Sequence, residues 1–272
     1  MLQDFFSRHP VFTLEEVINF LQERASAEAN IDTRKALLRY HQEQGHIVRI
    51  RRGLYASVQT GFDAKGFPVD PFLITSKLAI DAVLAYHTAL DFWGLSYSVW
   101  HQFTYVTNHP RCRSVAFQNS TFRAVRQPPA LSSTNNALFD VKTEERQGLN
   151  VRVTSQERTL VDVLARPDLA GGWEEIWRSL ELANYFDISK IVQYALLLQN
   201  ATTIAKVGFF LQQHQEQFSV KDNQLAELKS FIPVKPHYGE RSQGVQNKFL
   251  PEWNLIMPLQ VVERSWEETY GF

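Results

Sequence analysis

The sequence has almost no cysteine, since Cys112 is the single one among 272 residues. One thiol can form neither an internal disulfide nor a zinc site with several cysteine ligands. A chain without disulfides is typical of a reducing compartment. Glycine and proline are also scarce, with 12 and 11 residues, whereas 19 Phe, 9 Tyr and 6 Trp are enough to fill a large buried core.

Long hydrophobic runs are absent as well. No stretch approaches the roughly 18 uncharged apolar residues that a membrane-spanning helix needs. The first residues, MLQDFFSRHP, place Asp4 ahead of any apolar run and lack the cationic start of a secretory signal. We therefore expect a cytoplasmic protein. Its 44% hydrophobic and 21% charged residues are ordinary for a globular chain, and its length predicts two domains.

The motifs of common catalytic sites are missing too. The sequence contains no GxxxxGK[ST] or GxGxxG phosphate loop, no GxSxG nucleophile elbow and no HExxH zinc motif. Its eight histidines are scattered, and His87 beside an apolar helix is interpreted as a hydrogen-bonded structural residue. We expect no catalytic residue, no cofactor and no metal, and therefore a protein that is not an enzyme.

One carboxylate cluster is weighed as an exception. Asp140 precedes Lys142 and the pair Glu144-Glu145 on a predicted strand, an arrangement with a faint likeness to the metal-binding carboxylates and lysine of restriction-type nucleases. The order of the residues differs, and no Glu-x-Lys follows. A solvated strand end is the preferred interpretation.

A strong excess of one charge is absent overall, because 28 Lys and Arg stand against 29 Asp and Glu. The distribution is uneven, however. Residues 33–53 hold six basic residues against one acidic residue, Glu43. These basic residues are Arg34, Lys35, Arg39, Arg49, Arg51 and Arg52. Positive charge focused in one short stretch is what a phosphate-binding surface needs.

Around this stretch, the pattern predicts two helices and a hairpin. Thr13 and Glu16 form a capping box that starts a helix over 13–25. After a polar connection over 26–31, a second helix is predicted over 33–44, ended by Gly45. We place Ala36, Leu37 and Tyr40 on its inner face. A β-hairpin follows, with strands 46–50 and 54–58 around the turn Arg51-Arg52-Gly53.

This order of elements is that of a winged helix-turn-helix. The second helix of such a module enters the major groove, and the hairpin wing contacts the flanking backbone. Arginine can bridge phosphate oxygens or read guanine, so the basic residues suit both positions. Two other interpretations remain: a helix–helix–hairpin that docks another protein, and a basic run that is merely a solvated surface.

The rest of the chain predicts a larger mixed domain. Residues 58–71 are rich in turn-forming residues and predict a linker. Helices are expected over 70–80 and 85–93, and five short strands over 101–155. Further helices follow from Ser155, which caps a helix carrying Arg158 and Asp162 four residues apart. The tail over 232–272 is expected to be mostly irregular, with Trp253 and Ile256 packing back. The fold class is therefore α+β: a winged helix-turn-helix over 1–60, a linker over 61–71, and a second domain over 72–272.

Three blocks in this order resemble the AbiEi family. They are GHIVRIRRGLYA (45–56), AYHTALDFWGL (85–95) and SQERTLVDVLARPDLAGG (155–172), and the closing KFLPEWNLIMP (248–258) is also similar. The family comprises antitoxins and transcriptional regulators of type IV abortive-infection toxin–antitoxin systems. The resemblance covers nearly the whole chain.

The resemblance implies a function. Such proteins repress their own operon through an N-terminal winged helix that binds promoter DNA, and a larger C-terminal domain is needed for antitoxicity. Their partner is a nucleotidyltransferase-like toxin, with no stable complex required. The implied DNA contacts are Arg34, Lys35 and Arg39 on the helix and Arg49, Arg51, Arg52 and Tyr55 on the wing. The connection 26–32 is longer than is usual for a helix-turn-helix, which leaves the start of the second helix open.

The sequence leaves two questions open. DNA could be bound by a homodimer or cooperatively by monomers. The second domain could also bind the toxin directly, with a winged helix that only docks protein and binds no DNA.

Overall fold

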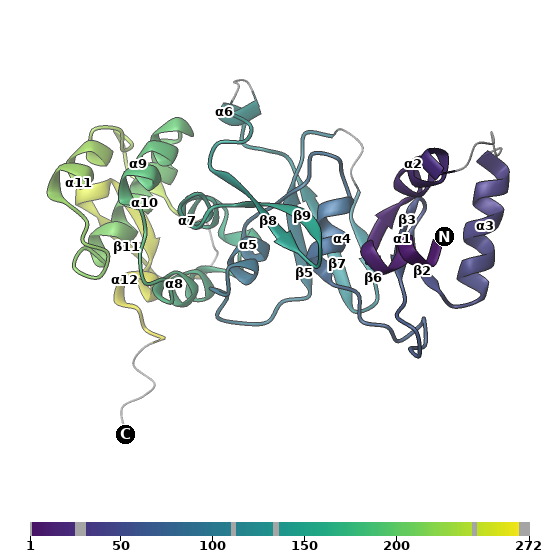
Figure 1. Ribbon diagram of the computed structural model, residues 1–272. Helices are drawn as coiled ribbons and strands as arrows, with labels where there is room; N and C mark the ends of the chain where they lie inside the picture. The colour runs from purple at the N-terminus through teal and green to yellow at the C-terminus, as the bar shows by residue number, and fades with distance from the viewer. Residues whose placement is uncertain (1, 25–30, 110–112, 133–135, 241–243, 267–272) are drawn as a thin grey trace. The chain divides into compact units, whose positions relative to one another are not determined.

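The computed structural model describes residues 2–24, 31–109, 113–132, 136–240 and 244–266, without the side chains of Arg24 and residues 31–34 (Figure 1). The fold is mixed α and β, with helices and three sheets. The chain divides into two compact units. Unit 1 comprises residues 1–84, 101–125 and 143–152, and unit 2 comprises 85–100, 126–142 and 153–272.

The N-terminal module of unit 1, residues 2–58, contains the predicted helices and hairpin. In chain order its elements are α1 (Leu2–Arg8), β1 (Val11–Thr13), α2 (Leu14–Arg24), α3 (Ile31–Glu43), β2 (Ile47–Arg51) and β3 (Leu54–Ser57). The strands form an antiparallel sheet in the order β1-β3-β2. Helices α2 and α3 and the hairpin are confirmed within about two residues, whereas α1 and β1 were not predicted. The predicted connection over 26–31 lies almost wholly outside the described residues.

An aromatic core holds this module together. Phe5 and Phe6 of α1 pack on Phe12 of β1, with ring centroids 5.3 and 5.5 Å away. Leu38 of α3 and Ile47 of β2 join the same buried cluster. Helix α1 thus contributes two of the largest side chains of the core, and burial of each stabilises the module by about 1.5–3 kcal/mol.

The remainder of unit 1 contains most of a six-stranded sheet in the order β6-β7-β5-β4-β9-β8. Its strands are β4 (Val83–Leu84), β5 (Gln102–Val106), β6 (Val115–Phe117), β7 (Ser120–Val125), β8 (Val141–Arg146) and β9 (Leu149–Thr154). Strands β5 and β7 are parallel, whereas β4 and β6 run antiparallel to their neighbours β5 and β7. Helix α4 (Pro71–Lys77) begins at Asp70, whose carboxylate accepts hydrogen bonds from the amides of Phe72 and Leu73.

Unit 2 is mainly helical. It contains α5 (His87–Phe92), α6 (Pro129–Ser132), α7 (Gln156–Ala165), the 3-10 turn η1 (Pro167–Leu169), α8 (Trp173–Glu181), α9 (Ile188–Leu197), α10 (Ala201–Gln213) and α11 (Asp222–Lys229). The predicted cap of α7 is confirmed, because Ser155 Oγ accepts the amide of Arg158 at 3.0 Å.

The tail is more ordered than predicted. It forms a three-stranded sheet in the order β10-β12-β11, from β10 (His237–Tyr238), β11 (Asn247–Leu250) and β12 (Leu255–Pro258). A 3-10 turn, η2 (Pro251–Trp253), and the short helix α12 (Leu259–Glu263) complete it. Trp253 is 1% exposed, as expected for a side chain that packs back. The sheet and the short helix of the tail were therefore not predicted from the sequence.

The predicted linker contains no helix or strand between Val58 and Asp70. It lies within unit 1, and both units draw on several separate segments of chain. The domain boundaries at 60 and 72 stay a prediction, because compact units are defined by contacts rather than by independent folding.

Candidate nucleic-acid interface

Helix α2 is fixed at its start by the predicted capping box. The amide of Thr13 donates to Glu16 Oε2 at 2.7 Å, and the amide of Glu16 donates to Thr13 Oγ1 at 3.2 Å. Glu16 also forms an ion pair with Lys77 at the end of α4. Burial alone would raise the pKa of Glu16, but the hydrogen bonds from Lys77 and Thr13 outweigh it and lower this pKa. The start of α2 is therefore held to α4 as well as to its own backbone.

Helix α3 ends where the sequence predicts. Gly45 has a φ of +73°, a conformation that costs other residues free energy. The amide of the next residue, His46, donates to the carbonyl of His41 at 2.9 Å and closes the last turn. The rings of His41 and His46 lie with their Nδ1 atoms 3.1 Å apart. Burial and the neighbouring His46 lower the pKa of His41.

The outward face of α3 differs from the prediction. Leu38 is buried at 2% exposure, and Leu37 and His41 are half-buried beside it. Ala36 and Tyr40, which we placed inside, are exposed. At 100° per residue, the positions two before and two after Leu38 lie about 200° around the helix from it. The placement of Ala36 and Tyr40 on the inner face was therefore wrong.

Three of the predicted helix contacts lie on α3. Lys35 and Arg39 are exposed, and the side chain of Arg34 lies outside the described part of the chain. Arg39 forms no hydrogen bond or ion pair with the residues that the structure describes. Its guanidinium is available to an external ligand.

The hairpin carries the second group of predicted contacts. Gly53, with a φ of +81°, makes the turn between β2 and β3. Arg49 on β2 and Arg52 in the turn are exposed and, among the described residues, have no hydrogen-bond or ion-pair partner. We call β2, β3 and their turn the basic hairpin.

Arg51 differs from its neighbours. It is half-buried, and its Nη2 donates to the carbonyl of Leu78, just after α4, at 2.6 Å. Its Nε atom is buried without a partner in the described chain. Arg51 is therefore not fully exposed, because α4 lies beside the turn and the carbonyl of Leu78 accepts its hydrogen bond. Its contact with DNA stays a prediction.

Tyr55 belongs to the core instead of the surface. It lies opposite Phe12 on one side and opposite Arg49 on the other in the three-stranded sheet. Its ring stacks on that of Phe12 at 5.8 Å, and it is half-buried. The structure thus brings Arg49 and Tyr55 side by side and leaves the tyrosine packed on the core.

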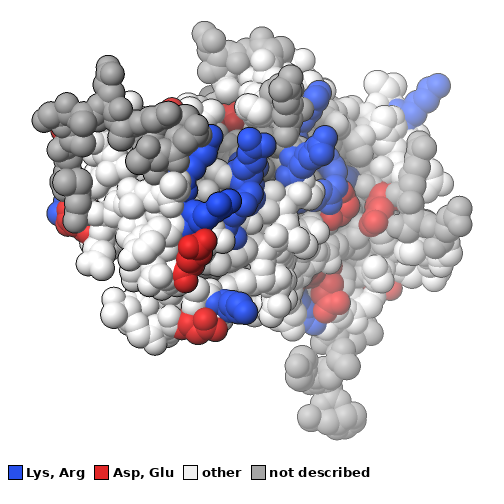
Figure 2. All heavy atoms as spheres, turned by 90° about the vertical axis from the view of Figure 1, so that its right-hand side faces the viewer, with Lys and Arg blue, Asp and Glu red and all other residues white. Residues whose placement is uncertain are grey.

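Figure 2 views the molecule from the side of α3, where Lys and Arg gather in a band.

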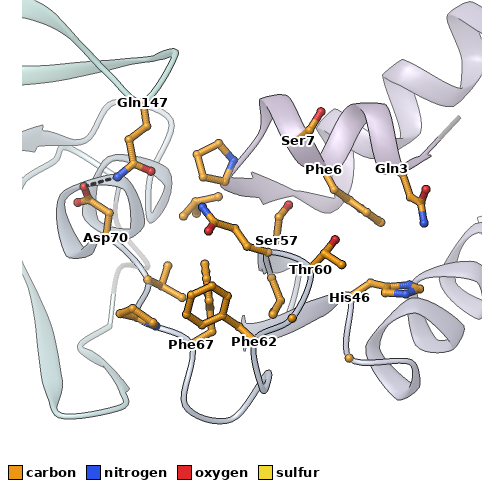
Figure 3. Close-up of a pocket in the computed structure, with 18 of the residues that line it drawn as sticks. Gln3, Phe6, Ser7, His46, Ser57, Thr60, Phe62, Phe67, Asp70 and Gln147 are labelled. Atoms are coloured by element: carbon orange, nitrogen blue, oxygen red, sulfur yellow. Dashed lines mark hydrogen bonds between the residues drawn. The ribbon is translucent and has the colours of Figure 1, made fainter.

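A cavity of about 680 Å³ lies elsewhere in unit 1, between α1, the end of α3 and residues 57–70 (Figure 3). Phe62 and Phe67 meet edge to face in its wall, with centroids 5.5 Å apart. Its carboxylate, Asp70, accepts hydrogen bonds from Gln147 and Arg146 and caps α4. The ionisable groups of its lining are therefore Asp70, whose carboxylate is occupied by these hydrogen bonds, and His46.

The nuclease-like cluster is engaged in local ion pairs. Asp140 Oδ1 lies 3.5 Å from Lys142 Nζ and 3.9 Å from Lys190 Nζ, and Asp140 also accepts the hydroxyl of Ser155. The described residues contain no group of three or more His, Cys, Asp or Glu side chains placed to hold a metal ion. Cys112 lies outside the described residues.

Unit 2 buries two charged networks. Arg158, at 0% exposure, lies 3.4 Å from Asp162 and donates to the carbonyl of Phe139 at 2.7 Å. The hydroxyl of Tyr194 donates to the other oxygen of Asp162 at 2.7 Å. Burial raises the pKa of Asp162, and Arg158 and Tyr194 oppose this effect.

The second network centres on Glu175 of α8. It accepts hydrogen bonds from the amides of Tyr97 and Ser98 at 3.1 and 3.0 Å and from the hydroxyl of Ser98 at 2.6 Å. His87 Nε2 lies 3.0 Å from Glu175 Oε1, so the hydrogen bond predicted for His87 is confirmed. Burial alone would raise the pKa of Glu175, but the hydrogen bonds from His87 and Ser98 lower it to about 2.

Comparison with known proteins finds a family match for the N-terminal module. Residues 1–58 match the family model of the AbiEi antitoxin transcriptional regulators. The AbiEi resemblance is confirmed over this segment, which contains α3 and the basic hairpin. The blocks at 85–95 and 155–172 lie beyond the AbiEi match. No curated protein matches the sequence of this chain.

The whole fold has a solved counterpart. The crystal structure of the RV2827C protein from Mycobacterium tuberculosis is similar with a TM-score of 0.62 and 15% sequence identity. The likeness covers 97% of this chain and 92% of that chain, so the fold is shared over nearly the full length. In the described part of the chain, no helix has the length and apolarity needed to cross a lipid bilayer.

Proposed function

We propose that the protein is a DNA-binding autorepressor and antitoxin of a type IV toxin–antitoxin system, without enzymatic activity of its own. Its N-terminal module acts as a winged helix-turn-helix, with α3 as the recognition helix and the basic hairpin as the wing. It works in the cytoplasm, beside its operator, and counteracts a nucleotidyltransferase-like toxin. The AbiEi match over residues 1–58 supports the proposal.

One observation carries the DNA-binding part. Arg39 on α3 and Arg49 and Arg52 on the basic hairpin are exposed, and none has a hydrogen-bond or ion-pair partner among the described residues. An arginine kept for stability normally packs against a carboxylate or carbonyl. Exposed guanidinium groups without partners suit phosphate oxygens and guanine edges.

The two elements divide the work. On the basic hairpin, Arg49 and Arg52 neutralise phosphates, which gives affinity but little sequence selection. On α3, Arg39 projects from the outward face and can reach a base edge in the major groove. The half-buried Arg51 and the packed Tyr55 support the hairpin from within.

The test uses the full-length protein and a duplex carrying the sequence upstream of its own reading frame. Fluorescence anisotropy measures affinity between 50 and 200 mM salt for the wild type, Arg52→Ala and Arg39→Ala. We expect Arg52→Ala to flatten the salt slope by about one unit, because one phosphate contact is lost. We expect Arg39→Ala to weaken binding by about 1–3 kcal/mol and to relax specificity.

The matched control is Arg166→Ala. Arg166 is an exposed arginine of unit 2 that is paired with Asp168, so its loss removes the same charge far from α3 in the sequence. Its salt slope should equal that of the wild type. If the wild type binds no duplex but co-purifies with the toxin at high salt, the module is a protein-docking unit and the autorepressor proposal is overturned.

A further inference from the structure

An exposed aromatic residue stands on the helix that we propose to enter DNA. Tyr40 of α3 is 53% exposed. Its ring meets that of His41 edge-on at 5.4 Å, and its hydroxyl forms no hydrogen bond with the described residues. Burying such a ring would be favourable, and α3 leaves it in solvent.

The surroundings of Tyr40 suit close approach to a duplex. Ala36 lies one turn earlier on the same side of α3 and is also exposed, and its side chain is a single methyl group. Arg39 precedes Tyr40 and is exposed and unpaired among the described residues. The outward face thus joins a guanidinium, a methyl group and an aromatic ring.

We propose that Tyr40 is a specificity-determining residue that reads a thymine in the major groove. Thymine presents its C5-methyl group there, and an apolar contact with that methyl distinguishes it from cytosine. The ring of Tyr40 packs on this methyl while Arg39 reads a neighbouring base pair. The inference rests on the proposed function, since it needs α3 to lie in the groove.

The experiment begins with selection of a preferred duplex from a random library by the full-length wild type. Affinity for the selected duplex and for a mixed-sequence duplex is then measured for the wild type, Tyr40→Ala and Tyr40→Phe. We expect Tyr40→Ala to lower the affinity for the selected duplex about 10-fold and that for the mixed-sequence duplex less than about 2-fold. Tyr40→Phe keeps the ring and should stay within about 2-fold of the wild type on both.

Replacing each thymine by deoxyuridine removes only the methyl group. Replacement of the one thymine that Tyr40 contacts in each bound site should lower the affinity of the wild type about 4-fold, which is the equivalent of one buried methyl group. Tyr40→Ala should lose nothing at that position, because the contact is already gone. The matched control is Tyr185→Ala, which removes a tyrosine of unit 2 that is also exposed, at 72%, and should behave as the wild type.

Each outcome decides the question. Equal losses for Tyr40→Ala on both duplexes, or the same deoxyuridine profile in the wild type and Tyr40→Ala, would overturn the role of Tyr40 and leave DNA binding intact. A wild type that selects no sequence and binds no duplex would overturn the proposed function itself, and the role of Tyr40 with it.

Discussion

Arginines occupy opposite settings in the two units of the molecule. In unit 1, Arg39 and Arg52 are exposed and have no partner in the described chain. In unit 2, Arg158 has 0% exposure and contacts a carboxylate and a carbonyl. The same guanidinium group is therefore open to an outside ligand in one unit and locked into the core in the other.

The contrast indicates that the partners of an arginine, not its residue type, set its contribution to stability. A buried charge needs its partners, because an uncompensated charge in the interior is strongly unfavourable. An exposed arginine keeps its hydration and contributes little to folding. Removing the first should unfold the protein, and removing the second should affect only binding. Three predictions test this division.

The largest effect is expected for Arg158→Ala. The substitution leaves the Asp162 carboxylate buried, with Tyr194 as its remaining side-chain hydrogen-bond donor among the described residues. We expect the free energy of unfolding to fall by about 3–5 kcal/mol, measured by urea denaturation. The control Arg166→Ala breaks an exposed pair with Asp168 and should cost less than about 1 kcal/mol. Equal costs for the two variants would contradict the division.

The next effect concerns acid. Because the pKa of Glu175 is lowered from 4.5 to about 2, its charged form stabilises the folded state. This stabilisation is complete above pH 4.5, and it is lost as the pH falls towards 2. Of a total of about 3 kcal/mol, about 2 should be gone at pH 3.

Denaturation of the wild type and Glu175→Gln at pH 6 and pH 3 measures this loss. Glu175→Gln removes the titrating group, so the gap between the two proteins should be wide at pH 6 and narrower by about 2 kcal/mol at pH 3. A gap that stays constant with pH would show that Glu175 does not titrate as the geometry indicates.

The smallest effect sharpens the comparison within the hairpin. Arg51 and Arg52 are neighbours, but only Arg51 donates to the carbonyl of Leu78. Arg51→Ala should therefore lower the free energy of unfolding by about 1–2 kcal/mol and change the salt slope of DNA binding little. Arg52→Ala should change the free energy of unfolding little and flatten the salt slope of DNA binding. If both variants flatten the slope equally, Arg51 leaves Leu78 when DNA binds.

Local patterns explain what could be predicted from the sequence. The capping box at Thr13 and Glu16 and the glycines at 45 and 53 mark the ends of elements within a few residues, so α2, α3 and the hairpin follow directly. The short α1 and β1 carry no such marks. Strands β10 to β12 form only because segments from 237 to 258 pair with one another, and no local period announces that.

The candidate site divides in the same way. Lys35, Arg39, Arg49 and Arg52 are exposed, and this exposure could be predicted because charged side chains usually lie at the surface. Arg51 depends on Leu78, 27 residues away, and such a contact leaves no trace in the local sequence. Tyr40 was placed inside because an aromatic residue is often buried. Which face of α3 points inward follows from the burial of Leu38, and that burial is visible only in the structure.

The path of the chain has a consequence for anyone who would dissect it. The polypeptide passes from one compact unit to the other five times, at residues 84, 100, 125, 142 and 152. A protein shortened to its last 200 or so residues would keep all of unit 2 and only fragments of unit 1. Neither unit can therefore be exchanged intact between relatives by a single recombination event.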